Sequence, residues 1–264
     1  MKKRTFLKAV LTLTVLAILF PMAVIAIWSV TGRWPWPNLL PESWTLRTLE
    51  ELFFGSAKLP QLLGSSISLA VAVAGLATVI SILTARATEF YDFHGKALIR
   101  FSGMLPLLVP GTVFAMGIQL VMLKLGLADR IAGVVLVHLV CALPYCIAIM
   151  GDVTRAVGVR LEEQARVLGA SPIRAFFAVT LPSLLPGILS SMSMGFILSY
   201  SQYFTTLMVG GGRVKTIALV LVPYIQSGDR ALASAYSVAF VGSTMIVFFI
   251  FEAMIKKLQK EGAD

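Results

Sequence analysis

Long apolar stretches separated by short polar segments run through the whole chain. A hydrocarbon core of about 30 Å is crossed by roughly 20 apolar residues in a helix, and six stretches have about that length. They cover approximately residues 6–30, 61–85, 99–123, 131–151, 184–208 and 233–255. Backbone groups in lipid must find hydrogen-bond partners within their own segment, and the alternating pattern of barrel strands is absent from the sequence. The pattern predicts an all-α, polytopic membrane bundle of about six transmembrane helices, forming a single domain over residues 1–264.

The composition excludes an ordinary soluble domain, because 58% of the 264 residues are hydrophobic and only 13% are charged. The first apolar stretch follows a basic start, Lys2-Lys3-Arg4, as the core of a secretory signal would. Its run from Phe6 to Val30 is longer than a signal core, and no small-x-small cleavage pattern follows. We therefore expect a retained first span.

Basic residues in the short loops predict the orientation, because Lys and Arg concentrate on the cytoplasmic side. The richer set comprises the N-terminus, Arg86/Lys96/Arg100, Arg155/Arg160/Arg166/Arg174 and Lys256/Lys257/Lys260. The poorer set comprises Arg33/Arg47/Lys58, Lys124/Arg130 and Arg213/Lys215/Arg230. We expect both termini and the 152–183 loop to lie in the cytoplasm. The net charge of +9 follows from this bias, and cations spread over many loops do not form a nucleic-acid-binding face.

The 152–183 loop has the pattern of two short helices. A helix over 161–168 is expected to place Leu161, Ala165 and Leu168 on its apolar face, and Glu162, Glu163 and Arg166 toward water or a partner. Gly169 ends this helix, and Ser171-Pro172 begins the next one as N-cap and first helical residue. Leu181-Pro182 is expected to break the second helix before the chain enters the bilayer. Such an elbow either rests in the membrane interface or transmits force from a partner.

The spacing of residues in this loop distinguishes the two alternatives. Glu163, Ala165, Gly169, Leu181 and Pro182 match the EAA loop, in which Glu-Ala-Ala is followed by Gly and then by Ile-x-Leu-Pro. Gln164 and Val179 depart from the pattern. The loop thus resembles that of permease subunits of binding-protein-dependent type I ABC importers. The resemblance implies that an ATPase subunit is gripped by Glu162, Glu163, Gln164, Ala165, Gly169, Leu181 and Pro182.

The resemblance extends over residues 60–255 and is closest to the iron, sulfate, thiamine and polyamine type of importer. Its further motifs are Leu63 to Ala70, Thr84-Ala-Arg86, the proline-broken Leu105 to Gly111 followed by Gly117, and Ser199 to Gly210. It implies a second permease, identical or related, a dimer of cytoplasmic ATPases and an external solute-binding protein. It also implies the plasma (inner) membrane of a prokaryote. The sequence has no Gly-x4-Gly-Lys-Ser/Thr phosphate loop, so the chain is expected not to be an enzyme, to bind no cofactor, and to leave ATP to its partner.

Polar residues at membrane depth are the candidates for the translocation pathway, because they are costly there unless they line a cavity. Tyr200, Gln202 and Tyr203 are the favoured candidates, and Gln119 is a weaker one. Serines and threonines of the same run are expected to bond to helix backbones or to neighbouring helices, and His138 to join two helices. Which residues contact solute, and whether the solute is a polyamine, thiamine, iron, phosphonate or sulfate, stay open.

Other features of the sequence favour an importer over other classes of membrane protein. Cys141 and Cys146 lie about 140° apart around one helix, so they are expected to be core residues rather than a disulfide or a metal site. An intramembrane enzyme would need a cluster of catalytic groups that the spans do not show. An ion-coupled secondary transporter is the main alternative, since broken spans also occur there.

Segment 31–60, with Trp34, Trp36 and Trp44, is either an interfacial segment or an outer surface that receives a partner.

Overall fold

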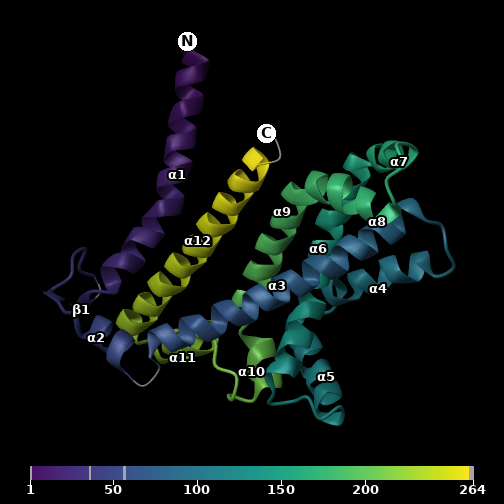
Figure 1. The fold of residues 1–264 in the computed structure, drawn as a ribbon. Coiled ribbons are helices and arrows are strands. Elements are labelled where there is room, and N and C mark those ends of the chain that lie inside the picture. The colour runs from purple at the N-terminus through teal and green to yellow at the C-terminus, as the bar shows by residue number, and fades with distance from the viewer. Residues whose placement is uncertain (1, 36, 56–57, 262–264) are drawn as a thin grey trace. The chain divides into compact units, whose positions relative to one another are not determined.

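The computed structural model describes residues 2–35, 37–55 and 58–261, and it is predominantly helical (Figure 1). The helices are α1 (Lys2–Trp28), α2 (Arg47–Phe54), α3 (Leu59–Phe90), α4 (Lys96–Leu108), α5 (Gly111–Lys124), α6 (Ile131–Val157), α7 (Arg160–Val167), α8 (Pro172–Ala175), a π-turn η1 (Phe176–Thr180), α9 (Leu181–Tyr200), α10 (Phe204–Gly210), α11 (Ile217–Ser227) and α12 (Arg230–Glu261). A small antiparallel pair, β1 (Thr31–Arg33) and β2 (Ser43–Trp44), lies between α1 and α2 in the sequence. The predicted all-α membrane fold is confirmed.

Five helical segments of the described chain are long and apolar enough to cross a membrane, or six if one bent pair counts as a single span. The five are Phe6–Trp28, Leu59–Phe90, Ile131–Val157, Pro172–Tyr200 and Arg230–Met254. The bent pair is Lys96–Pro106 with Gly111–Lys124, which corresponds to the predicted proline-broken third span. Pro110 restricts the residue before it to extended backbone, and Val109 accordingly has φ −98° and ψ 130°. The two helices meet at 109°.

The fifth span differs from its prediction. It was expected over 184–208 with a break at Leu181-Pro182, and both expectations are wrong, since the helix runs from Pro172 to Tyr200. The turn before the proline widens to a π-helix, in which the amide of Leu181 donates to the carbonyl of Phe176, five residues earlier. This wider turn accommodates a residue that lacks an N–H group and clashes with the carbonyl of residue i−4 in a regular helix. The chain instead leaves the helix at Ser201–Tyr203, before α10.

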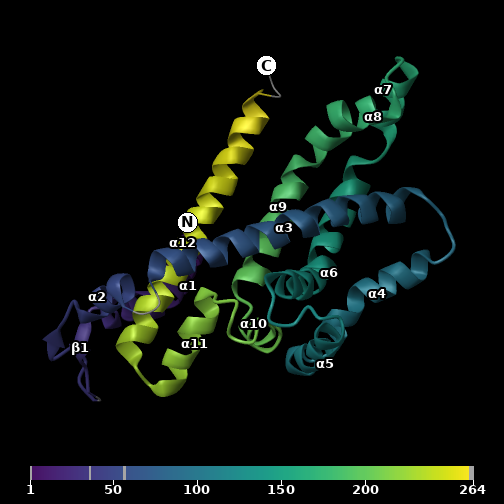
Figure 2. The ribbon, with the colours of Figure 1, turned by 60° about the horizontal axis from the view of Figure 1, so that its bottom comes forward.

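The chain divides into two compact units, one of Met1–Leu63 and Val220–Ser243 and the other of Gly64–Leu219 and Thr244–Asp264. In the second unit α6 packs along α9, and α3 passes across them in both views (Figure 2). The close approach of α9 to α3 depends on glycine, because a Cβ at Gly195 would lie 3.1 Å from the Cα of Ala74. Beside it, the hydroxyls of Thr78 and Ser191 share a 3.0 Å hydrogen bond between α3 and α9. Small side chains and a polar contact are typical of helix pairs in membranes.

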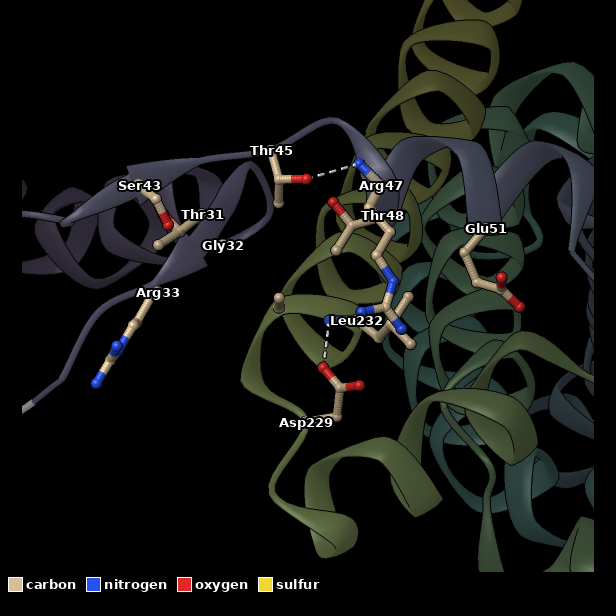
Figure 3. Close-up of a pocket in the computed structure, with 11 residues that line it drawn as sticks. Thr31, Gly32, Arg33, Ser43, Thr45, Arg47, Thr48, Glu51, Asp229 and Leu232 are labelled. Atoms are coloured by element: carbon tan, nitrogen blue, oxygen red, sulfur yellow. Dashed lines mark hydrogen bonds between the residues drawn. The ribbon is translucent and has the colours of Figure 1, made fainter.

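The first unit contains the β1–β2 pair and a cavity of about 400 Å³ (Figure 3). Asp229 lies beside this cavity and accepts a hydrogen bond from the amide of Leu232 at 3.1 Å, as an N-cap of α12. Trp34 stacks on Trp28 with ring centroids 4.9 Å apart, and Trp44 is exposed. Trp36 lies outside the described residues.

Candidate functional site: the 152–183 loop and the polar core

The connection between α7 and α8 is a defined helix cap. Gly169 has φ +94°, a conformation that glycine adopts without strain. Its amide donates to the carbonyl of Arg166 at 3.0 Å, and the amide of Ala170 donates to the carbonyl of Ala165 at 3.0 Å. These are the two hydrogen bonds of a Schellman motif. Ser171 then caps α8 by accepting a hydrogen bond from the amide of Arg174 at 3.3 Å, and Pro172 follows it. The predicted cap, N-cap and first-turn proline are all confirmed.

The direction of the faces of α7 corrects the sequence prediction. Leu161 and Leu168, expected on the apolar face of this helix, are exposed, and Leu168 has 88% of its surface accessible. Ala165 is half-buried, whereas Glu162, expected to point toward water or a partner, turns inward with a side chain that is 14% exposed. The reason is electrostatic, because an arginine of α3 lies beneath α7 and attracts the carboxylate.

That arginine is Arg86, and it joins three elements. Its Nη2 donates to both carboxylate oxygens of Glu162, at 2.9 and 3.2 Å. The hydroxyl of Thr180, in the π-turn, donates to the same carboxylate at 2.8 Å. The guanidinium also lies over the ring of Phe176, 4.9 Å from its centroid, which is a cation–π arrangement. Glu162, Thr180 and Phe176 all belong to the 152–183 loop.

The outward surface of the loop has a different composition. Glu163, Gln164 and Arg166 are exposed on α7. Val167, Leu168 and Ile173 beside them are 86%, 88% and 73% exposed. Exposed apolar residues grouped with charged ones are typical of a surface that binds a partner protein. Of the other loop residues, Leu181 is half-buried and Pro182 is exposed, at the start of α9.

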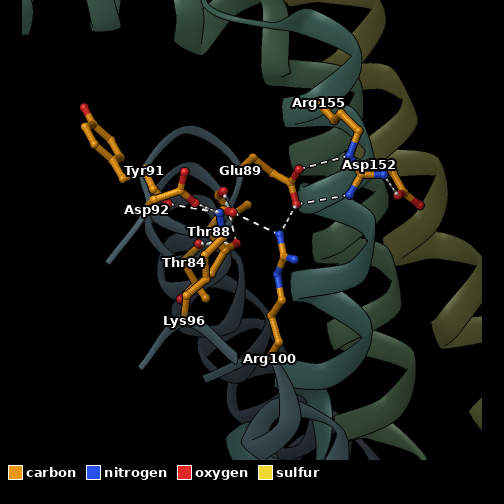
Figure 4. Close-up of polar contacts among 10 residues, drawn as sticks. Thr84, Thr88, Glu89, Tyr91, Asp92, Lys96, Arg100, Asp152 and Arg155 are labelled. Atoms are coloured by element: carbon orange, nitrogen blue, oxygen red, sulfur yellow. Dashed lines mark hydrogen bonds and ion pairs between the residues drawn. The ribbon is translucent and has the colours of Figure 1, made fainter. Parts of the chain in front are cut away.

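A second ionic cluster, shown in Figure 4, was not predicted from the sequence. Glu89 lies one turn beyond Arg86 on α3 and accepts hydrogen bonds from Nε and Nη2 of Arg155, on α6, at 3.0 and 3.1 Å. It also accepts one from Nη2 of Arg100, on α4, at 3.3 Å. Next to it, Lys96 donates to Asp92 at 2.9 Å, and this hydrogen bond lowers the pKa of the Asp92 carboxyl. The end of α3 is therefore tied to α4 and α6 as well as to the loop.

The residues expected to line a pathway lie on different elements. Tyr200 is buried, with its ring stacked on Phe196 at 5.1 Å, and Tyr203 is half-buried beyond the end of α9. Gln202 is half-buried, and its Oε1 accepts a hydrogen bond from Thr205 at 2.8 Å. Gln119 is half-buried on α5.

His138 joins two helices as expected. Its Nε2 lies 2.9 Å from the hydroxyl oxygen of Thr206, and its Nδ1 lies 2.9 Å from that of Ser199. The Thr206 hydroxyl donates its own hydrogen to the carbonyl of Gln202 at 2.7 Å, so Nε2 is the donor to Thr206 and Nδ1 accepts from Ser199. Ser199, Ser201 and Thr206 therefore bond to the backbone or to a neighbouring helix, as predicted. Thr205 instead bonds to the side chain of Gln202. Among the described residues no group of three potential metal ligands occurs.

The broken helices, the long helical spans and the capped two-helix loop together define a polytopic helical membrane protein. Residues 77–261 match the family described as binding-protein-dependent transport system inner membrane component, and the chain belongs to that family. It is therefore the permease component of a binding-protein-dependent ABC importer, and a multi-pass membrane protein.

Two relatives illustrate the match. The putrescine transport system permease protein PotI of Escherichia coli (strain K12) is 25% identical over 83% of this chain and 80% of its own length. The molybdenum transport system permease protein ModB of Haemophilus influenzae is 27% identical over 74% of this chain and 94% of its own. In a solved bacterial ABC transporter involved in the import of the acidic polysaccharide alginate, one chain matches with a TM-score of 0.72 at 18% identity, covering 96% of each chain. That likeness shows the fold.

Proposed function

We propose that this chain forms half of the translocation pathway of an ATP-driven importer and docks a separate ATPase subunit through the surface of residues 160–182. The observation that carries the proposal is the outward surface of α7 and α8. It presents Glu163 beside the exposed apolar side chains of Val167, Leu168 and Ile173. A protein partner that covers these apolar groups gains their burial, at about 25 cal/mol per Å² of apolar surface.

The charge on this surface indicates the chemistry of the partner. Glu163 is acidic and exposed, while Arg160 and Arg166 stand on the same short helix. A complementary groove would place a basic side chain toward Glu163 and apolar side chains toward Leu168, and such pairing fixes orientation more than it adds affinity. Family membership supports this assignment over the ion-coupled secondary transporter, because the family's transport systems depend on a binding protein.

The assembly that follows has three kinds of partner. A cytoplasmic ATPase dimer supplies ATP hydrolysis, a second permease completes the pathway, and an external binding protein delivers solute. In this arrangement the 152–183 loop and both termini face the cytoplasm. Closure of the ATPase dimer draws the two loops together and opens the pathway to the outside.

The solute is proposed to be small and polar or charged. The relatives are named as transport systems for putrescine and for molybdenum, at 25% and 27% identity. One name refers to a polyamine and the other to a metal, so similarity to them does not select one solute. The binding protein is expected to supply that selectivity.

The test is site-specific cross-linking in the native membrane. Cys141 and Cys146 are replaced by alanine, and a single cysteine is placed at Leu168, which is 88% exposed. A matched control cysteine is placed at Asp92, whose side chain is 99% exposed in the neighbouring loop. Mass spectrometry is expected to find a nucleotide-binding subunit captured from Leu168→Cys and not from Asp92→Cys. Capture of lipid alone, or equal capture from both positions, would reject the docking surface.

A further inference from the structure

Arg86 connects the proposed docking surface to α3, a helix of 32 residues. Its two contacts with Glu162 fix α7, and the Thr180 hydroxyl and the Phe176 ring fix the π-turn to the same guanidinium. The side chains of Arg86 and Glu162 are 17% and 14% exposed, so water screens this pair much less than it screens a surface pair. We call Arg86, Glu162, Thr180 and Phe176 the loop clamp.

The clamp has an unused donor. Within the described residues, Nη1 of Arg86 is buried and has no hydrogen-bond partner. Buried polar atoms without partners are rare in folded proteins. A guanidinium that is held on one side and unsatisfied on the other can exchange contacts when the loop moves, without being exposed to water.

Helix α3 is also hydrogen-bonded to another segment of the chain near its N-terminal end. Near its start, the hydroxyl of Ser65 donates to the carbonyl of Lys215 at 3.1 Å, and the hydroxyl of Ser66 accepts from the amide of Ile217 at 2.8 Å. At about 1.5 Å rise per residue, Ser65 and Arg86 are roughly 30 Å apart along the helix. No proline lies between them. The segment 211–217 is therefore bonded to the same rigid helix as the loop, at the opposite end.

We infer that Arg86 is the positioning residue that passes displacement of the docking loop to α3, and through α3 to the segment 211–217. This inference rests on the proposed function, since it needs an ATPase to move the loop. Glu162 acts on the inner side of α7, whereas Glu163 acts on the outer side. Of the two consecutive acids, Glu162 therefore passes displacement of the loop to α3, and Glu163 contacts the ATPase.

The experiment uses the complete importer in lipid nanodiscs, with its ATPase, second permease and binding protein. The native cysteines are replaced by alanine and a reporter cysteine is placed at Arg213, which is exposed in the segment bonded to α3. The rate of reaction with a charged maleimide is measured with and without ATP and vanadate. Arg86→Ala, Glu162→Gln and the exchange Arg86→Glu/Glu162→Arg are compared with the unchanged clamp. Asp92→Asn is the matched control, because it removes an exposed ion pair from the loop that follows the same helix.

The expected result is a several-fold ATP-dependent change in labelling with the intact clamp and in Asp92→Asn. The ATP-dependent change in labelling is lost in Arg86→Ala and in Glu162→Gln. Both variants still cross-link to the ATPase through Leu168→Cys, and the importers that contain them still hydrolyse ATP. The exchange Arg86→Glu/Glu162→Arg restores part of the labelling change. An ATP-dependent change that persists in both single variants would overturn the inference. So would an equal loss in Asp92→Asn, or loss of ATPase capture in the clamp variants, because the clamp would then only shape the docking surface. Failure of the intact protein to capture an ATPase would instead reject the proposed function, and the inference with it.

Discussion

Glu162 and Glu163 are adjacent in α7 and have opposite surroundings. Glu162 is held inside by Arg86 at 2.9 Å, and Glu163 is exposed. Successive residues of an α-helix are rotated by about 100°, so neighbouring side chains can face a protein core and a partner at once. Predictions about the loop must therefore treat the two acids separately.

Charge reversal at Glu163 should affect docking and not folding. We expect Glu163→Lys to abolish capture of the ATPase while leaving the free energy of unfolding within about 0.5 kcal/mol, as is usual for exposed positions. Cross-linking from Leu168→Cys and thermal unfolding in detergent measure the two effects. Glu162→Lys is the contrasting variant, and it should destabilise the loop by roughly 1–3 kcal/mol because it leaves Arg86 without its partner. Equal behaviour of the two variants would contradict the opposed orientations.

Substitution of Gly169 should loosen the connection between α7 and α8. An alanine at φ +94° is strained by roughly 1–2 kcal/mol, so we expect faster hydrogen exchange at the amides of 160–170 and weaker ATPase capture in Gly169→Ala. Gly151→Ala is the matched control, because it lies within α6 with no atom within 4 Å of an added Cβ. If both variants exchange at the same rate, the positive φ is not what holds the cap.

The packing of α9 on α3 should be sensitive to a single methyl group. In Gly195→Ala the added Cβ lies 3.1 Å from the Cα of Ala74 and 3.4 Å from Sγ of Cys146. A backbone atom cannot move aside, so we expect a loss of about 1–3 kcal/mol in the free energy of unfolding. Gly75→Ala, on α3 with open space around it, should instead be neutral or stabilising by about 0.5–1 kcal/mol. Thermal unfolding of the purified protein compares the two.

Removing one hydroxyl should expose the role of His138 in the core. Thr206→Val keeps the shape of the side chain and leaves the Nε2–H of His138 without its acceptor, at a cost of about 1–3 kcal/mol. Ser201→Ala removes a hydroxyl that is exposed and bonds to a carbonyl of its own helix at 2.8 Å, and it should change stability by less than about 0.5 kcal/mol. Similar unfolding temperatures for Thr206→Val and the unchanged protein would show that the histidine finds another acceptor.

Sequence reasoning predicted the features that depend on local chemistry. Gly169, Ser171 and Pro172 have conformational preferences that act within a few residues, so the cap and the start of α8 were predicted correctly. Apolar length likewise located the other spans, though not the bounds of the fifth, because the bilayer sets that length. The inward turn of Glu162 could not be predicted, since it depends on Arg86, which lies 76 positions away in the chain. The Glu89–Arg155 pair was missed for the same reason.

The error at Leu181-Pro182 has a different origin. Proline is a reliable helix breaker when the preceding backbone is regular, but here the preceding turn widens and the helix continues. The position of this widening could not be read from the sequence, because Phe176 to Thr180 contains neither glycine nor proline. The break after Tyr200 was missed in turn, since the predicted span was placed too far along the chain.

The π-turn also determines how α9, which follows it, is rotated about its own axis. Each residue turns a helix by about 100°, so the extra residue accommodated at Phe176–Thr180 determines which side of α9 meets its neighbours. Gly187 faces Val153 and Gly195 faces Ala74 in this phase. A one-residue deletion in the turn would rotate both glycines away from these neighbours while leaving the sequence of α9 unchanged. The wide turn therefore fixes the rotation of α9 relative to α8, although the two belong to one continuous helix from Pro172 to Tyr200.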